Sequence, residues 1–263
     1  MNIGFIGRGR VATAFAQFFS EQNIEICGFH TRTSPNFEML SKSDIVFIAT
    51  PDDAISSIIN EIEPKIKGSK VYCHFSGAIS SNVLLPLAKN GAVICSLHPA
   101  MTFAGEVDLS KIAYTFEGSG DGIGEFMYFL HSCGIKPIMI NTEDKPLYHA
   151  AMCNASNHIT TIIYSTFEML KKLHITKEEM FSLIAPLSKK ALENALNLSP
   201  EVALTGPISR GDVETIKSHI PYVDKTYTNL AMRTVDLALS AGRIDKEKAE
   251  NIREVLENAN NNT

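Results

Sequence analysis

A glycine-rich turn between an apolar run and a helical pattern constrains the fold more than any other feature. Residues 3–12 read I-G-F-I-G-R-G-R-V-A, so a run typical of a buried strand leads directly into Gly7-x-Gly9-x-x-Ala12. Gly7 permits a tight turn, Gly9 lets the backbone approach a pyrophosphate, and Ala12 permits close helix–strand packing. The following helix offers free N–H groups and its positive dipole end to an anion. This order predicts a dinucleotide-binding Rossmann unit, with a glycine turn that binds no nucleotide as the alternative.

Short apolar runs alternate with helical patterns over the first half of the chain. The expected strands are Ile3–Ile6, Ile24–Phe29, Ile45–Ala49, Lys70–Phe75, Ala92–Leu97, Ala113–Glu117 and Lys136–Ile140. The expected helices between them are Val11–Ser20, Asp53–Ile59, Val83–Lys89 and Gly122–Cys133. Such alternation predicts an α/β domain with a mostly parallel sheet, covered on both faces. Asp52 or Asp53 is expected to cap the helix that begins there.

The second half of the chain has a different character. Helical periods dominate from Lys145 to Glu257, and no strand pattern there is convincing. Thr176 and Glu179 form a capping-box pattern, and Pro186 is expected to kink or divide its helix. The chain is therefore predicted to consist of a Rossmann domain over residues 1–142 and an all-α domain over residues 143–263.

The end of the second expected strand indicates which dinucleotide is bound. An NAD site usually has Asp or Glu there, about 20 residues after the glycines, to bind the ribose 2′-hydroxyl. This chain has F-H-T-R-T-S at residues 29–34, and Arg32 can pair with a 2′-phosphate. NADP(H) is therefore predicted in preference to NAD, with a solvated Arg32 as the alternative. The residues predicted to bind the cofactor are Gly7, Arg8, Gly9, Arg10, Val11, Thr31, Arg32, Thr33, Thr50, Pro51 and Ser76.

His98 opens the first of three polar clusters that are candidates for the reacting groups. It follows the strand Ala92–Leu97 directly, and in open α/β sheets the carboxyl ends of strands face the ligand. A histidine with an ordinary pKa near 6.5 can donate a proton to a developing alkoxide. The alternative is a structural histidine that bonds the backbone in a proline turn.

The second cluster lies on an expected helix around residues 148–158. Its polar residues are spaced so that they share one helix face; they are His149, Cys153, Ser156, Asn157 and Thr160. A polar stripe of this kind faces either water or a site, and an interdomain cleft is the expectation. Hydrogen bonds between helices of the second domain are the alternative.

The third cluster is the loop L-T-G-P-I-S-R-G-D at residues 204–212, which ends at a helix that Asp212 is expected to cap. Arg210 can bind a carboxylate with two parallel hydrogen bonds. The alternative is that Arg210 fixes the loop by bonding its carbonyl groups.

The composition excludes several classes of function. The net charge of −5, from 24 Lys and Arg against 29 Asp and Glu, argues against a general nucleic-acid binder. No apolar run is long enough for a membrane span, and no signal peptide is expected. The five cysteines form no C-x-x-C pair and are expected to be reduced thiols of a cytoplasmic protein. No zinc-binding spacing occurs, so no metal is expected.

Taken together, these motifs resemble a known family. The stretches are G-F-I-G-R-G-R-V, A-T-P-D-D-A-I, H-F-S-G-A, L-H-P-A-M-T-F, Y-H-A-A-M-C-N-A-S-N-H and A-L-T-G-P-I-S-R-G-D-V. They occur in the order found in Rossmann-like proteins with a helical C-terminal domain of the DUF2520 type. That family is related to the wider 6-phosphogluconate and pyrroline-carboxylate reductase superfamily, and some members look like an alternative ketopantoate reductase of pantothenate biosynthesis. The resemblance implies NADPH-dependent reduction of a small 2-oxo acid, with ketopantoate (2-dehydropantoate) as the leading candidate.

The resemblance also implies roles for individual residues. Related β-hydroxyacid dehydrogenases and the common ketopantoate reductases carry a catalytic Lys four residues before a helical Asn. Here Asn157 is present, but Cys153 occupies the Lys position. His98 is then the expected proton donor, because its His-Pro setting is similar to the catalytic His segment of prephenate dehydrogenases, while His149 could replace or tune it. The expected catalytic residues are His98, Asn157 and His149, and the expected substrate-binding residues are Arg210, Thr205, Ser156 and Ser76.

Other functions stay open at this point. One is reduction of a different keto acid or of an imine, which needs less help from an acid; the other is a non-catalytic NADP(H) sensor. The helical domain, residues 143–263, is expected to bind substrate and to form a homodimer. Long amphipathic helices such as Tyr227–Ala241 can pair across a two-fold axis.

Overall fold

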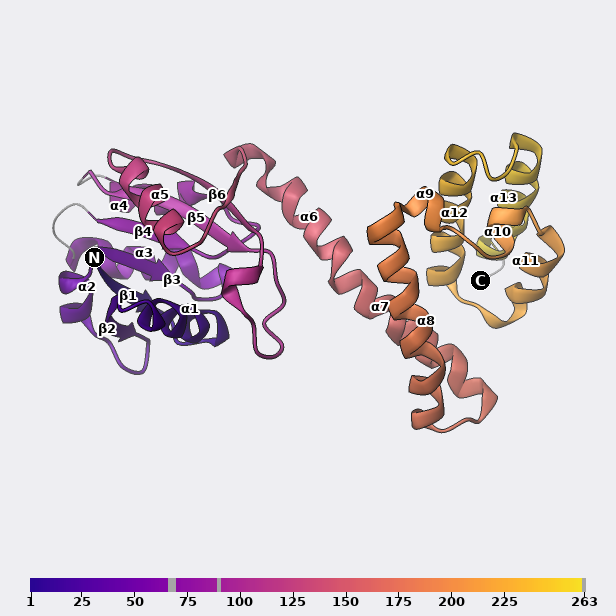
Figure 1. The fold of residues 1–263 in the computed structure, drawn as a ribbon, viewed down its shortest axis with the longest axis horizontal. Coiled ribbons are helices and arrows are strands. Elements are labelled where there is room, and N and C mark those ends of the chain that lie inside the picture. The colour runs from indigo at the N-terminus through magenta and orange to yellow at the C-terminus, as the bar shows by residue number, and fades with distance from the viewer. Residues whose placement is uncertain (66–69, 89–90, 262–263) are drawn as a thin grey trace. The chain divides into compact units, whose positions relative to one another are not determined.

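The computed structural model describes residues 1–65, 70–88 and 91–261. The chain forms two compact units, Met1–Asn157 and His158–Thr263 (Figure 1). The division falls at the start of helix α7 (Asn157–Leu170), whereas the change of composition near residue 142 comes just before helix α6 (Lys145–Ala155). The assignment of residues 1–142 and 143–263 as functional domains stays a prediction.

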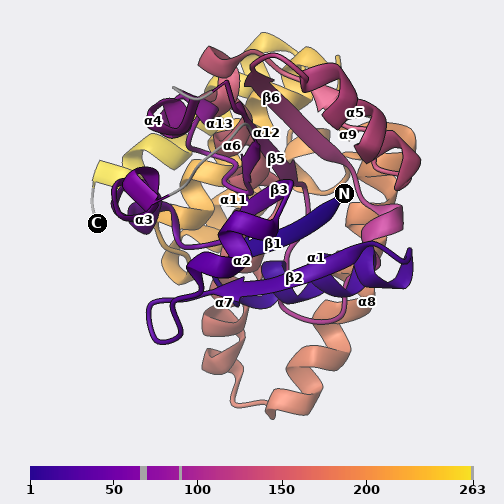
Figure 2. The same ribbon diagram turned by 90° about the vertical axis from the view of Figure 1, so that its left-hand side faces the viewer.

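A seven-stranded sheet with the order β2-β1-β3-β4-β5-β6-β7 forms the centre of the first unit. Neighbouring strands are parallel except β5 and β6, which are antiparallel. In Figure 2 the labelled strands β2, β1, β3, β5 and β6 follow this order, with β2 at one edge. The strands are β1 (Asn2–Ile6), β2 (Glu25–His30), β3 (Ile45–Ile48), β4 (Val71–His74), β5 (Val93–Pro99), β6 (Tyr114–Ser119) and β7 (Ile138–Met139). All seven expected strands are present, and the predicted α/β class is confirmed.

Successive side chains of the central strands point to opposite faces of the sheet and pack in two separate hydrophobic cores, one on each face. On β3, Ile45 and Phe47 pack in one core, whereas Val46 and Ile48 pack in the other. The first core includes α1 (Arg10–Glu21) and α5 (Ile123–Ser132); the second includes α2 (Phe37–Lys42), α3 (Ile55–Ile62) and α4 (Leu85–Ala88). Because both faces are buried, β3 consists of apolar residues throughout. This burial fixes the strand ends from which the candidate site is built.

The expected helices of this unit are present with shifted ends. The expectation for Val83–Lys89 corresponds to a 3₁₀ turn followed by α4, and Lys89 lies outside the described residues. Helix α2 was not expected; the Asn36 side chain caps it by accepting a hydrogen bond from Met39 N. The expected aspartate cap of α3 is wrong, because a 3₁₀ turn over Asp52–Ala54 precedes the helix and no side chain caps either element.

The second unit is helical over its described residues, as predicted. After α7 come α8 (Lys177–Leu198), α9 (Pro200–Ala203), α10 (Pro207–Arg210), α11 (Val213–His219), α12 (Lys225–Ser240) and α13 (Lys246–Asn261). The capping box of Thr176 and Glu179 is confirmed at the start of α8, and the helix continues through Pro186 without division. One apolar core joins α11, α12 and α13, and Val235 and Ile252 are fully buried in it.

The polar stripe expected on one continuous helix is interrupted at Ser156. This residue has non-helical backbone angles and separates α6 from α7. Its hydroxyl oxygen lies 2.9 Å from Met152 O and 2.8 Å from Asn157 Oδ1, so it can donate its one proton to either acceptor. A serine hydroxyl that bonds the carbonyl four residues earlier commonly bends or weakens a helix. His149 and Thr160 therefore lie on different helices, so the expectation of one continuous helix is wrong, whereas the shared face stays a prediction.

Candidate active site

The glycine turn connects β1 to α1 with a backbone that requires glycine. Gly7 has φ +95°, and a Cβ there would lie 2.5 Å from Ala49 O. A Cβ at Gly9, by contrast, would meet no atom within 4 Å, so this backbone borders open space at the start of α1. No side chain of the described residues caps α1, and its first turn holds no acid. The turn therefore leaves backbone N–H groups available to an anion.

The turn after β2 lies beside the glycine turn, because Gly7 N donates to His30 O at 2.9 Å. Two backbone hydrogen bonds close this second turn and leave Arg32 exposed at its tip. The Arg8 guanidinium lies over the Phe29 ring, 5.3 Å from the ring centre. The two turns together combine positive charge with the absence of any acid from residues 29–36, which fits a 2′-phosphate better than a 2′-hydroxyl.

A cavity of about 1040 Å³ opens beside the glycine turn, between α1 and residues 103–109. Arg8, Gly9 and Arg10 line one end of it. Arg10 also donates to Phe103 O at 3.2 Å, which ties the loop to the start of α1. The cavity therefore includes three of the residues predicted to bind the cofactor.

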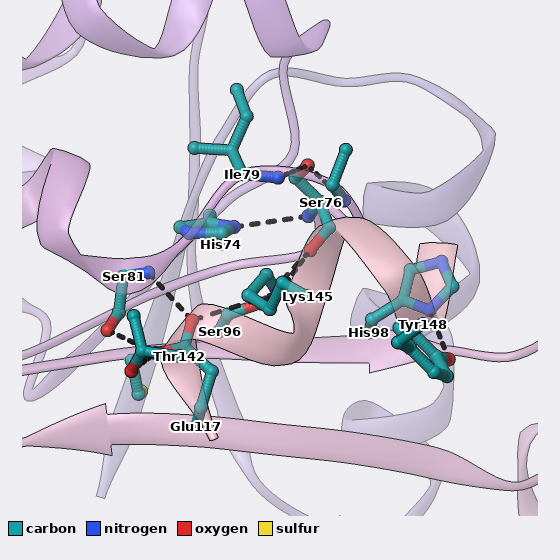
Figure 3. Close-up of polar contacts among 12 residues, drawn as sticks. His74, Ser76, Ile79, Ser81, Ser96, His98, Glu117, Thr142, Lys145 and Tyr148 are labelled. Atoms are coloured by element: carbon teal, nitrogen blue, oxygen red, sulfur yellow. Dashed lines mark hydrogen bonds and ion pairs between the residues drawn. The ribbon is translucent and has the colours of Figure 1, made fainter. Parts of the chain in front are cut away.

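Ser76 follows β4 and is held through both its side chain and its backbone. Its hydroxyl donates to Asp52 Oδ2 at 2.8 Å and accepts from the N–H groups of Ala78 and Ile79 at 3.2 and 2.9 Å. Its own N–H donates to His74 Nδ1 at 3.1 Å (Figure 3). Asp52 thus stabilises this turn instead of capping α3. Direct contact of Ser76 with cofactor or substrate stays a prediction.

His98 and His149 converge on the residue after Ser76. A Cβ at Gly77 would lie 2.8 Å from both His98 Nε2 and His149 Cδ2, so the two rings leave room only for glycine. The ring centres are 6.2 Å apart. His98 Nδ1 lies 2.7 Å from the hydroxyl oxygen of Tyr148, on the first turns of α6 (Figure 3). Two of the three residues predicted to be catalytic therefore form a cluster, to which Tyr148 is added.

The surroundings of His98 favour its neutral form. Burial, then the charge of Lys145 and the neighbouring His149, lower its pKa to about 4. His98 is therefore uncharged at neutral pH, and the imidazolium donor expected from its position is disfavoured. If Tyr148 donates to Nδ1, the neutral ring carries its proton on Nε2, the atom next to Gly77.

A buried ion pair next to this turn was not predicted. Lys145, the first residue of α6, places Nζ 3.7 Å from Glu117 Oε1 on β6. The same Nζ donates to Ser76 O at 3.0 Å and to Ser96 Oγ at 2.7 Å (Figure 3). Burial lowers the pKa of Lys145, and the Glu117 carboxylate opposes that shift. The ammonium therefore connects α6 to β5, to β6 and to the turn after β4.

Two signals in the sequence could have indicated this pair. Lys145 begins a helix, where its charge opposes the helix dipole, and Glu117 lies within a strand of otherwise apolar and small residues. Either charge is unfavourable in such a place unless it has a buried partner.

Thr205 and Arg210 belong to the second unit, so their contribution to the site stays a prediction, as does that of Ser156 and Asn157 at the unit boundary. Arg210 is exposed at the end of α10. The alternative that Arg210 fixes the loop by bonding its carbonyl groups also stays untested.

Residues 1–65, 70–88 and 91–261 contain neither a metal-binding cluster nor a membrane-spanning helix. No group of three or more His, Cys, Asp or Glu side chains there could hold a metal ion. None of the helices in those ranges is long and apolar enough to cross a membrane.

Two family models match different parts of the chain. Residues 31–99 match a Rossmann-like domain, and residues 112–234 match DUF2520, a domain of unknown function. The chain thus combines the two parts that its motifs predicted, and the predicted resemblance is confirmed. No curated protein matches the chain.

Solved structures of similar fold span nearly the whole chain. Protein TM1727 from Thermotoga maritima is 23% identical, with a TM-score of 0.65 over 98% of this chain and 99% of that one. A pyrroline-5-carboxylate reductase from Streptococcus pyogenes is 15% identical, with a TM-score of 0.61 over 99% and 98%. A Plasmodium falciparum pyrroline carboxylate reductase with NADP bound is 17% identical, with a TM-score of 0.58 over 97% and 98%. These likenesses show a shared fold.

Proposed function

We propose that the protein is an NADP(H)-dependent reductase. The observation that carries this proposal is the open glycine turn at the start of α1, bonded through Gly7 N to the acid-free, basic turn after β2. The similarity of fold to a reductase solved with NADP bound supports it.

Residues at different strand ends would bind different parts of the cofactor. The N-terminus of α1 would bind the pyrophosphate, and Arg32 with the threonines on either side of it would bind the 2′-phosphate. Thr50 and Ser76, after β3 and β4, would border the nicotinamide. When bound, NADPH supplies the hydride.

The proposed substrate is a small 2-oxo acid, with ketopantoate as the leading candidate. Hydride addition at C2 leaves an alkoxide, which must take up one proton. Neutral His98 donates a hydrogen bond from Nε2 to this oxygen and passes the proton on, while the half-buried Tyr148 returns a proton to Nδ1 and regains one from water. Arg210 would bind the carboxylate, and Asn157 would align the carbonyl group.

A second candidate reaction is reduction of an imine, and the low pKa of His98 favours it. A protonated imine carries its own proton, so hydride addition yields an amine without an acid in the site. The Asp52 carboxylate, exposed and bonded to Ser76, would attract such a cation.

Oxidation of NADPH against a panel of 2-oxo acids and cyclic imines tests these proposals. Ketopantoate turnover that His98→Ala lowers by orders of magnitude, with little change in NADPH affinity, supports the oxo-acid reaction. Imine turnover that the same variant barely lowers supports the second candidate. Tight NADPH binding without turnover of any compound would indicate a non-catalytic sensor and contradict both reactions.

We further propose that the helical unit forms a homodimer. Helix α12 uses its buried face, including Val235, against α13, so the expected pairing through Tyr227–Ala241 is not favoured. Exposed apolar side chains lie instead on α8, where Leu187 and Leu196 are 73% and 77% exposed. Such side chains commonly mark an interface when they are contiguous. Light scattering at micromolar concentration should give a dimeric mass that Leu187→Glu with Leu196→Glu reduces; a monomeric wild type would contradict the proposal.

A further inference from the structure

The peptide that links Ser76 to Gly77 is held from one side. Its carbonyl oxygen accepts hydrogen bonds from Lys145 Nζ and Ser96 Oγ, both at 3.0 Å. A trans peptide directs its N–H away from its carbonyl oxygen, and no cis peptide occurs among the described residues. The N–H of Gly77 therefore points away from Lys145.

That N–H has no acceptor among the described residues, unlike the N–H groups on either side of it. Those of Ser76, Ala78 and Ile79 each donate to a side chain of the same turn. Gly77 is buried, and buried backbone donors are almost always paired. Gly77 is also the residue on which His98 and His149 converge. Its N–H is thus placed to bind an oxygen from outside the chain.

On the other side of the same peptide lies a fully buried and fully bonded ion pair. Lys145 is 1% exposed and Glu117 is 2% exposed. Glu117 accepts hydrogen bonds from Ser81 N and Ser81 Oγ at 2.7 and 2.6 Å, and from Thr142 Oγ1 at 2.9 Å (Figure 3). Burying two charges carries a desolvation cost, and apolar side chains often stabilise a fold equally well. Stabilisation of the fold alone is therefore a weak explanation for the presence of this buried ion pair.

We propose that Lys145, oriented by Glu117, polarises the Ser76–Gly77 peptide so that the Gly77 N–H binds the oxygen that becomes negative during reduction. This inference rests on the proposed function. The ligand group is the carbonyl oxygen of a small 2-oxo acid and the alkoxide that forms from it. An ammonium bonded to a peptide carbonyl strengthens the N–H of that peptide as a donor, because linked hydrogen bonds polarise one another.

The position of His98 fits the same role. Its Nε2 lies beside Gly77, so the developing charge would meet two donors, one from the backbone and one from the imidazole. Lys145 itself is buried and touches no substrate, so it is a positioning residue. Loss of Lys145 should therefore raise the free energy of the transition state and leave the affinity for NADPH unchanged.

The test uses the double variant Lys145→Met with Glu117→Gln in the full chain. It removes both charges together, so neither is left buried without its partner. The value of kcat with the best substrate of the panel is expected to fall about tenfold, less than the roughly 100-fold cost of deleting an oxyanion donor, because the Gly77 N–H remains and loses only its polarisation, with KM and NADPH affinity nearly unchanged. A wild-type kcat, or a loss confined to NADPH affinity, would overturn the proposal.

Lys70→Met is the matched control. Lys70 also donates to backbone carbonyls of the first unit, those of Ser41 and Ser43, and burial lowers its pKa in the same direction. It lies outside the candidate site, so its loss should reduce stability without changing kcat. A similar fall of kcat in this control would show that loss of a lysine bonded to backbone carbonyls acts through stability and would overturn the proposal.

A second measurement does not need turnover. The amide proton of Gly77, observed by nuclear magnetic resonance, should move upfield in the double variant but not in Lys70→Met. Oxalate, used as an anionic oxygen probe, should shift this resonance in the wild type and much less in the double variant. An unmoved Gly77 resonance contradicts the polarisation. If NADPH fails to bind while this resonance responds as expected, the proposed function fails and the polarisation of the peptide stands.

Discussion

One methyl group added at Gly77 should disable the site while the fold is kept. The new Cβ of Gly77→Ala would lie 2.8 Å from His98 Nε2 and from His149 Cδ2, and an ordinary contact begins at 3.4 Å. Each ring, or the turn itself, must therefore retreat by about 0.6 Å. For His98 that movement would distort the 2.7 Å hydrogen bond between Nδ1 and the Tyr148 hydroxyl, which lies on another side of the ring.

The size of the effect follows from this displacement. Overpacking of this kind typically costs about 1–3 kcal/mol of stability, which the protein should survive. Misplacement of reacting groups by about 1 Å can cost about 100-fold in rate, so kcat should fall by one to two orders of magnitude. NADPH affinity should stay close to that of the wild type, because Gly7 and Gly9 are not disturbed.

The measurement is steady-state NADPH oxidation with the best substrate, together with thermal unfolding. Gly124→Ala on α5 is the control, because a Cβ there meets no atom within 4 Å and alanine favours a helix. Its activity should equal that of the wild type. Full kcat in Gly77→Ala would show that His98 and His149 do not need their positions around Gly77, and the reasoning about the site would be wrong.

Three further predictions concern single side chains and pH. Tyr148→Phe removes the partner of His98 Nδ1 and should lower kcat about tenfold at unchanged NADPH affinity; unchanged kcat would exclude the proton return through Tyr148. Arg32→Ala should weaken NADPH binding by about 10- to 100-fold and leave NADH binding unchanged, as titration can show; equal losses for both would contradict a 2′-phosphate contact. Because the pKa values of His74 and His98 are both about 4 in the folded protein, the unfolded chain takes up more protons below pH 6.5. Urea unfolding should therefore show stability falling as the pH drops from 6.5 to 4, by about 3 kcal/mol at most per histidine, whereas stability that is flat over this range would contradict those pKa values.

The sheet could be predicted from the sequence because each buried parallel strand is a short apolar run that ends at turn residues. The run Ile45–Ile48 is apolar throughout since both its faces are buried. Helix α2 was missed because it has only six residues, and its start depends on a single cap by Asn36. The break at Ser156 was missed because helical spacing alone does not show where a hydroxyl will bond the backbone.

The candidate site could be predicted only where one stretch of chain carries the signal. The glycine turn and the basic turn after β2 are local patterns, and His98 follows a strand directly. The Lys145–Glu117 pair joins residues from α6 and β6, and its partners Ser76 and Ser96 come from the turn after β4 and from β5. Such a cluster depends on tertiary packing. The neutral state of His98 depends on the same packing, because burial is the main cause of its lowered pKa.

Calorimetric titration of the purified protein with NADPH and with NADH tests the proposed cofactor site most directly. If the open start of α1 and the acid-free turn around Arg32 bind a phosphorylated dinucleotide, NADPH should bind at least about tenfold more tightly than NADH. Absence of heat with both NADPH and NADP⁺, in protein that is folded by circular dichroism, would mean that these two turns bind no dinucleotide and that the reductase proposal is wrong.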